Sequence, residues 1–237
     1  MRIPENAFSI SPNNIQNKIF SLCEKESHHA LKVLRLKKGD TVILLDGKSQ
    51  GYFGVIDQIK PKFLTGTIKK TIKNFGENQN AVHISPGLLK KNRFEILLEK
   101  ATELGVKEIH PIIMERSVKT KINIDRCNKI LVSAAKQCRR SFFPILHQPK
   151  DLQTLFNINE GCKYYACHLN ANFTLFNYKS ALKYPSNLII GPEGGFSETE
   201  LDIMKNRGVL FFHLGNRRLR AETAALSSIT LFNELGM

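Results

Sequence analysis

Apolar residues follow two different patterns along this chain, and the first pattern occupies the first third of the sequence. There, short apolar runs at residues 41–45, 52–59 and 63–72 alternate with turns. Asp46-Gly47 is a hairpin signal between the first two runs, and a short helix is expected over residues 27–34. Several short strands with closely spaced turn signals predict a small β-barrel.

The rest of the chain alternates strand patterns with helical ones. Apolar residues at i, i+3, i+4 and i+7 predict a helix over residues 92–104, which Gly105 ends. Ser197 and Glu200 form the capping box of a later helix. The other expected elements are helices at 125–139 and 221–235 and strands at 81–85, 108–113, 163–169, 187–190 and 209–214. This alternation predicts an α/β fold with a largely parallel sheet, covered by helices on both faces.

A polar, turn-rich segment at residues 74–80 separates the two patterns. Linkers between domains have this composition. We therefore expect two domains, at residues 1–74 and 75–237. A chain of 237 residues is long enough to give each of them a hydrophobic core.

The net charge of the chain indicates which kind of partner it binds. The chain carries 35 Lys and Arg against 21 Asp and Glu, a formal net charge of +14, and half of this surplus lies in the first 76 residues. A surplus of this size attracts polyanions, most often nucleic acid, although a merely solubilising charge is the alternative. No apolar run suits a membrane span, and no signal-peptide pattern is present. Five cysteines without C-x-x-C spacing favour reduced thiols in a cytoplasmic protein.

Two glycine-containing segments are candidate binding loops. Residues 191–195 (Gly-Pro-Glu-Gly-Gly) follow an apolar strand and precede the capped helix, where α/β sheets bind ligands. Residues 214–224 repeat this arrangement with three arginines at the helix start. Neither segment has the G-x-G-x-x-G or Walker pattern, which disfavours a dinucleotide or a triphosphate. Two loops that lie side by side and expose their backbone can hold a flat ligand such as an adenine ring. The alternatives are that the first segment is a plain strand-to-helix turn and that the second is a solvated basic turn.

No metal site is expected from the sequence. His28 and His29 are adjacent on a predicted helix, so their rings diverge and cannot chelate one ion together. The remaining candidates form no triad, no carboxylate pair and no H-x-x-x-H spacing: His83, His110, Ser117, His147 and His168.

Five sequence blocks stand in a characteristic order: 100–106 (KATELGV), 115–117 (ERS), 134–140 (AAKQCRR), 190–196 and 214–224. Residues 29–35 and 46–47 add two matches near the N-terminus. Together these blocks resemble the bacterial ribosomal RNA small-subunit uracil N3-methyltransferases, which belong to the SPOUT superfamily. The resemblance covers nearly the whole chain. Each block alone is a weak signal, but the combination is highly specific.

The resemblance implies a fold and an activity. The first domain is expected to be a PUA-like RNA-binding β-barrel, and the second a SPOUT-type parallel sheet with a trefoil knot, which protein chains generally avoid. The implied cofactor is S-adenosylmethionine, and the implied product is N3-methyluridine in 16S ribosomal RNA of the small subunit. A homodimer with its active site near the interface is also implied. A non-catalytic RNA-binding or ribosome assembly protein and a ribose 2′-O-methyltransferase are the alternatives.

The resemblance also assigns residues. Arg220 and Arg116 are expected to act on RNA phosphate or the uracil carbonyls, and Glu193 is the candidate proton acceptor or a loop-stabilising acceptor. The family commonly has an aliphatic residue in place of Arg218 and Glu in place of Lys136. The expected cofactor-binding residues are Leu169, Ile190, Gly191, Pro192, Glu193, Gly194, Gly195, Leu214, Gly215, Leu219, Arg220, Glu222, Thr223 and Ala224. The expected RNA-binding residues are Arg2, Arg35, Lys69, Lys70, Lys73, Arg139 and Arg140.

Overall fold

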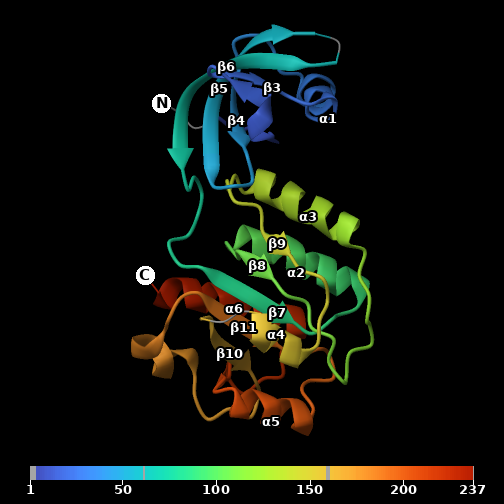
Figure 1. Ribbon diagram of the computed structural model, residues 1–237, viewed down its shortest axis with the longest axis vertical. Coiled ribbons are helices and arrows are strands. Elements are labelled where there is room, and N and C mark those ends of the chain that lie inside the picture. Colours follow the sequence, from blue (N-terminus) through green and yellow to red (C-terminus); the bar gives the residue numbers. More distant parts are fainter. Residues whose placement is uncertain (1–3, 61, 159–160, 237) are drawn as a thin grey trace. The chain divides into compact units, whose positions relative to one another are not determined.

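The computed structural model describes residues 4–60, 62–158 and 161–236. It divides into two compact units, shown in Figure 1. Unit 1 comprises Met1–Glu77 with Val132–Phe143, and unit 2 comprises Asn78–Leu131 with Pro144–Met237. The predicted boundary between residues 74 and 75 lies near the end of the first segment. Nothing in the sequence pattern indicated that residues 132–143 join unit 1.

Unit 1 is built on a curled six-stranded sheet in the order β1-β4-β5-β6-β3-β2 (Figure 1). β1 runs parallel to β4, and the other neighbours are antiparallel. The three longer strands match the predicted ones, whereas β1 to β3 have only two or three residues each, too few for a periodic pattern. The strand bounds are β1 Ala7–Ser9, β2 Ile15–Gln16, β3 Ile19–Ser21, β4 Thr41–Leu45, β5 Gln50–Ile59 and β6 Leu64–Lys73.

Phe20 belongs to the hydrophobic core of unit 1, and two glycines make room for its ring. Phe20 is fully buried. A Cβ atom added at Gly54 would lie 2.6 Å from the Phe20 ring, and one added at Gly66 would meet both the ring and the Val55 carbonyl oxygen. The predicted helix over 27–34 begins earlier, as α1 Glu24–His28, and continues as a π-helical segment, η2 His29–Val33. A short 3-10 turn, η1 Pro12–Asn14, follows β1.

Unit 2 contains a six-stranded sheet in the order β12-β10-β11-β7-β8-β9, and every neighbouring pair is parallel. The prediction of a parallel sheet is therefore confirmed. β8 is shorter than expected because Pro111, inside the predicted strand, has no N–H to donate to a ladder. The strand bounds are β7 Val82–Pro86, β8 Glu108–Ile109, β9 Ile145–Leu146, β10 Lys163–Cys167, β11 Ser186–Ile190 and β12 Leu210–Phe212.

Helices cover both faces of this sheet, as the alternating pattern predicted. Along β11, Leu188 and Ile190 join one buried cluster while Ile189 joins another, because successive side chains point to opposite faces. α2, α3 and α6 pack in the first cluster, and α4 and α5 in the second. The bounds are α2 Lys91–Glu103, α3 Ile124–Gln137, α4 Leu152–Ile158, η3 Leu175–Ala181, α5 Glu198–Asn206 and α6 Ala221–Leu235.

The predicted capping box at the start of α5 is confirmed. Ser197 Oγ accepts a hydrogen bond from the Glu200 N–H at 3.3 Å, and Glu200 Oε2 accepts one from the Ser197 N–H at 2.9 Å. Among the described residues, no helix has the length and apolar character to cross a bilayer.

Candidate functional site

A cavity of about 450 Å³ opens where β10, β11 and β12 end in unit 2. Its walls include Cys167, the last residue of β10, and Ile190, the last residue of β11. The carboxyl ends of neighbouring parallel strands meet at one edge of a sheet, so the loops that follow them converge there. Both predicted glycine segments contribute to this cavity.

Most of the predicted cofactor residues line the cavity. They are Leu169, Ile190, Gly191, Pro192, Glu193, Gly194, Gly195, Leu214, Gly215, Leu219, Arg220 and Ala224, and Arg116 lies beside them. Glu222 and Thr223 are not among the lining residues. Glu222 reaches the cavity through an ion pair with Arg93, whose Nε lies 3.7 Å from Glu222 Oε1. Thr223 is exposed on α6.

The loop at 191–195 makes a tight turn that depends on glycine. Gly195 has φ +71° and donates its N–H to the Pro192 carbonyl at 2.9 Å. At Gly194 the reason for glycine is a neighbour: an added Cβ would lie 2.8 Å from the Cβ of Arg116. Gly194 therefore permits the loop to pass close to the segment that carries Arg116.

Arg116 holds this loop in place. Its Nη1 donates to the carbonyl oxygens of Gly194 at 3.2 Å and Phe196 at 2.9 Å. The turn that carries Arg116 is itself anchored to α5, because the Glu115 N–H donates to Glu200 Oε1 at 2.9 Å. The Glu-Arg-Ser block thus has a structural role in holding this loop.

Arg93 links the two glycine loops, although nothing in its own sequence context indicated a site. Its Nη1 lies 3.3 Å from Glu193 Oε1 in the first loop, and its Nε pairs with Glu222 beyond the second. Arg218 adds a second link, since its Nη2 donates to the Glu193 carbonyl oxygen at 3.4 Å. Glu193 Oε2 and Glu222 Oε2 are buried and have no hydrogen-bond partner among the described residues.

Arg220 lies at the N-cap of α6 and lines the cavity. It is exposed, and within the described parts of the chain its guanidinium has no hydrogen bond or ion pair. With Arg93, Arg116, Arg217 and Arg218, it surrounds the cavity with five positive side chains. A wall of this kind attracts anionic groups such as RNA phosphates.

Two neutral polar groups complete the wall. Burial raises the pKa of the Cys167 thiol to about 11, although a hydrogen bond with Ser228 opposes the shift. Burial lowers the pKa of His168; Glu198 opposes this shift and Lys205 adds to it. Both side chains are therefore uncharged near neutral pH, so the charged groups of the cavity wall are the five arginines and Glu193.

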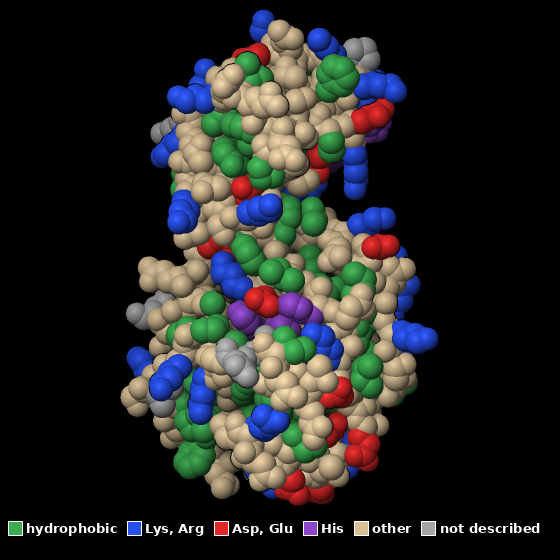
Figure 2. Space-filling model, in the orientation of Figure 1, with side chains coloured by type: hydrophobic (Ala, Val, Ile, Leu, Met, Phe, Trp, Pro, Cys, Tyr) green, Lys and Arg blue, Asp and Glu red, His purple; other side chains and the backbone are tan. Residues whose placement is uncertain are grey.

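Four of the predicted RNA-binding residues are exposed on unit 1: Arg35, Lys69, Lys70 and Lys73. Phe53 pairs with Lys70 while Gly54 pairs with Ile68, so Lys69 is the extra residue of a β-bulge, and both lysines lie exposed. Arg139 is half-buried. Arg2 lies outside the described residues. Figure 2 shows Lys and Arg side chains spread over this unit.

The prediction that Arg140 binds RNA is wrong. Its side chain is 1% exposed, and its Nη2 lies 3.0 Å from Glu77 Oε2, so the guanidinium neutralises a buried carboxylate inside unit 1. Lys136 is likewise engaged, with Nζ 2.7 Å from Glu26 Oε1. The Lys that replaces the family's usual Glu thus finds an acidic partner within the chain.

Comparisons with known proteins agree with this geometry. A model of the RNA methyltransferase domain matches residues 76–233, and a model of the RNA methyltransferase PUA domain matches residues 22–69. Ribosomal RNA small subunit methyltransferase E of Buchnera aphidicola subsp. Acyrthosiphon pisum is 30% identical over 222 residues, covering 90% of this chain and 87% of that protein. The Bacillus subtilis protein of the same name is 30% identical over 236 residues, covering 91% of each.

Solved structures of similar fold point to the same family. A Legionella pneumophila structure in complex with bound S-adenosylmethionine matches with a TM-score of 0.85 and 27% identity over 98% of both chains. The ribosomal RNA small subunit methyltransferase E of Neisseria gonorrhoeae shares the fold, with a TM-score of 0.85 at 23% identity over 97% of both chains. The chain therefore belongs to the ribosomal RNA small subunit methyltransferase E family, in which a PUA domain precedes an RNA methyltransferase domain.

Proposed function

We propose that this protein uses S-adenosylmethionine to methylate N3 of a uridine in 16S ribosomal RNA. The observation that carries the proposal is the convergence of both glycine loops and five arginines on one cavity of about 450 Å³. That volume lies within the range of about 300–1,000 Å³ usual for sites that hold small ligands. Membership of the rRNA methyltransferase family supports the reaction class, and the resemblance to uracil methyltransferases supports N3.

The cavity suits a nucleoside with a charged tail. Apolar side chains of Leu169, Ile190 and Leu219 can cover an adenine ring, and loop backbone groups can hydrogen-bond its edge. Glu193 lines the cavity, and its unpartnered Oε2 is an acceptor without a donor, which native proteins rarely leave buried. A hydroxyl or ammonium group of a ligand is a donor that would satisfy it.

When bound, the cofactor supplies a sulfonium methyl group that is already activated. The protein then has to align the uracil with that methyl group. Transfer breaks the methyl–sulfur bond and the N3–H bond, and forms the methyl–N3 bond. The charge of Arg220 near O2 or O4 would stabilise the uracil anion that forms as the proton leaves. Glu193 is the candidate acceptor of that proton, and unstacking of the base exposes N3.

The remaining features of the family belong to the same proposal: the homodimer, the trefoil knot and the cytoplasmic setting. Three exposed apolar side chains after β10 are suited to a subunit interface: Leu169, which lines the cavity, Phe173 and Phe176. These three residues are 48%, 51% and 65% exposed.

The test is methylation of small ribosomal subunits taken from a strain that lacks this modification. The complete protein is incubated with the subunits and methyl-labelled S-adenosylmethionine, and the RNA is digested for nucleoside mass spectrometry. We expect label in N3-methyluridine. Label in a 2′-O-methylated nucleoside would contradict the assigned atom. Binding of S-adenosylhomocysteine without any methylation of subunits or naked RNA would contradict the enzyme and favour an assembly protein.

A further inference from the structure

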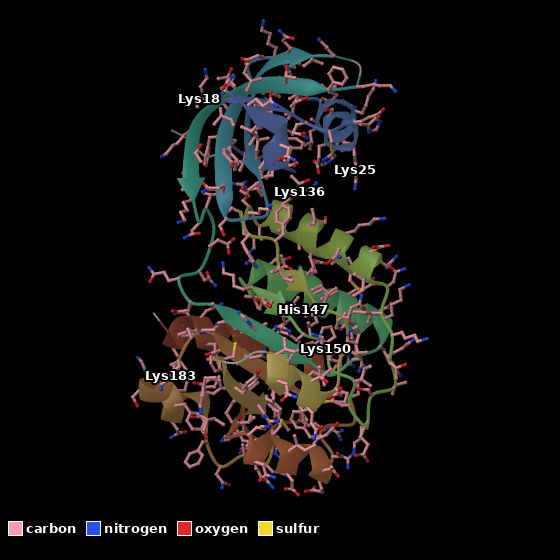
Figure 3. The ribbon with its side chains drawn as sticks, in the orientation of Figure 1. Lys18, Lys25, Lys136, His147, Lys150 and Lys183 are labelled. Carbon is pink, nitrogen blue, oxygen red and sulfur yellow. The ribbon has the colours of Figure 1, made fainter. Side chains whose placement is uncertain are left out.

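A second group of chemically active side chains lies on the sheet of unit 2. In the β7–β8 ladder, His83 is in register with Glu108. Residues two apart on a strand share a face, so His110 projects on the same side as Glu108. His147 directly follows β9, the neighbour of β8. Figure 2 shows histidine side chains gathered around an acidic one on this unit, and Figure 3 labels His147 and Lys150 there.

These side chains converge on one carboxylate. Glu108 Oε2 lies 2.6 Å from His147 Nε2 and 3.4 Å from His110 Nε2. One ligand atom each from His83, Glu108 and His110 all lie within 4.8 Å of one another. The rings of His110 and His147 are stacked with centroids 4.1 Å apart. Three imidazoles and one carboxylate therefore share a small volume.

Two of the imidazoles are buried and lie close to the carboxylate. His83 and His110 are only 8% and 4% exposed, and the side chain of His147 is partly exposed. Imidazole is the commonest metal ligand among protein side chains.

We propose that His83, Glu108 and His110 form a binding site for one divalent transition metal ion, of which zinc is the representative, and that His147 orients Glu108 through their contact. Two imidazole nitrogens and a carboxylate oxygen are a known donor set for zinc, with water in the fourth position. Bonds of about 2.0–2.2 Å place tetrahedral ligand atoms roughly 3.3–3.6 Å apart. The Glu108–His110 spacing of 3.4 Å lies in that range, and the ligand atoms of His83, Glu108 and His110 all lie within 4.8 Å of one another, so modest side-chain movements bring the three groups to an ion.

The position of the cluster indicates a structural role. β8 and β9 each have only two residues, and β9 is at the edge of the sheet. Their backbone ladders are therefore short. A metal ion held by His83, Glu108 and His110 would cross-link β7 with β8, and the contact of His147 with Glu108 extends this link to β9. His83 lies near the start of β7, whereas the cofactor loops follow the ends of β10 to β12, so the ion would not take part in methyl transfer. The positive charge of Lys150 would weaken binding of the ion, because it lies close enough to His110 to act on that residue electrostatically.

The test is calorimetric titration of the complete, untagged, chelator-treated protein with zinc chloride. We expect one ion per chain, and a higher thermal unfolding temperature with zinc than without it. Glu108→Gln and His147→Gln should each weaken zinc binding by more than about tenfold. Lys150→Met should tighten it, because a positive charge beside the ion is removed. The exposed His28 in unit 1 supplies the control, since His28→Gln should bind zinc as the parent does.

The proposal fails if the parent protein takes up no zinc at high micromolar concentration. It also fails if Glu108→Gln and His147→Gln bind zinc as tightly as the parent, because the ion would then be held elsewhere. Far-ultraviolet circular dichroism of the metal-free variants checks that each one folds. His147 is partly exposed, so His147→Gln retains the test if the change at Glu108 disrupts the sheet.

Discussion

At the scale of single residues, the arginines of the cavity wall differ in their contacts. Some of them hold the loops, whereas one is available to a ligand. Arg93 pairs with Glu193 and Glu222, and Arg116 donates to loop carbonyl groups. Arg220 has no such protein partner in the described part of the chain. The three side chains line one cavity, yet only Arg220 can change its contacts without loosening the loops.

Replacement of Arg220 by Ala should therefore reduce turnover much more than cofactor affinity. Loss of one preorganised charge at a developing anion typically costs roughly 10²-fold in kcat. Steady-state methylation kinetics give kcat, and calorimetry with S-adenosylhomocysteine gives the affinity. Arg217→Ala is the matched control, because Arg217 lines the same cavity and is also exposed. Equal losses of turnover and affinity in Arg220→Ala would assign Arg220 to folding.

The pKa of Cys167 makes a prediction about pH. Because burial raises this pKa to about 11, the thiolate fraction rises about tenfold for each pH unit between pH 7 and 10. Alkylation of Cys167 by iodoacetamide should be slow at neutral pH and accelerate over that range. Peptide mass spectrometry measures the rate, with exposed Cys23 as the internal reference. Labelling of Cys167 as fast as Cys23 at pH 7 would be inconsistent with a buried thiol.

At the scale of elements, contacts with the segment that follows β8 determine the conformation of the loop after β11. The two approach so closely that a Cβ added at Gly194 would lie 2.8 Å from the Cβ of Arg116. The hydrogen bonds of Arg116 then fix the loop on that segment. Loop shape is consequently a property of two sequence-distant elements.

Gly194→Ala should weaken cofactor binding, because the new Cβ displaces the loop from Arg116. The control is Gly208→Ala, which introduces a side chain at φ +68° after α5, where an added Cβ meets no described atom within 4 Å. Both changes should lower stability by about 1 kcal/mol, measured by urea unfolding. Only Gly194→Ala should reduce affinity for S-adenosylhomocysteine. Normal titration by the Gly194 variant would show that this contact does not shape the cavity.

At the scale of the whole molecule, each unit is assembled from two separate stretches of chain. Residues 132–143 belong with residues 1–77, and the buried pair of Arg140 with Glu77 joins the two stretches. A helix that begins in unit 2 thus ends in unit 1.

Arg140→Met should destabilise unit 1 by about 3–5 kcal/mol, because it removes the guanidinium that pairs with the buried Glu77 carboxylate. Denaturant unfolding followed by circular dichroism measures the loss. Arg139→Met is the neighbouring control and should cost less than about 1 kcal/mol, since Arg139 is only half-buried. A double variant with Glu77→Met should recover part of the stability.

Charge on unit 1 makes a separate prediction about RNA. Changing Lys69, Lys70 and Lys73 together to Gln should weaken RNA binding and reduce the slope of log affinity against log salt by roughly 0.7–0.9 for each lost phosphate contact. Filter binding at several salt concentrations measures this slope. Affinity for S-adenosylhomocysteine should stay at the parent value, because the cavity lies in unit 2. An unchanged salt slope would exclude these lysines from the RNA surface.

The sequence by itself determined the features that depend on neighbours along the chain. Four features are local patterns that could be found before any coordinates: the capping box at Ser197, the periodicity of α2, the strand-to-loop breaks at Gly191 and Gly215, and the family blocks. Only the tertiary structure decided which distant residues meet: Arg93 with both loops, Arg140 with Glu77, and Glu108 with His83, His110 and His147. The physical reason is that strand order and register set these contacts, whereas hydrophobic periodicity records only which face of an element is buried.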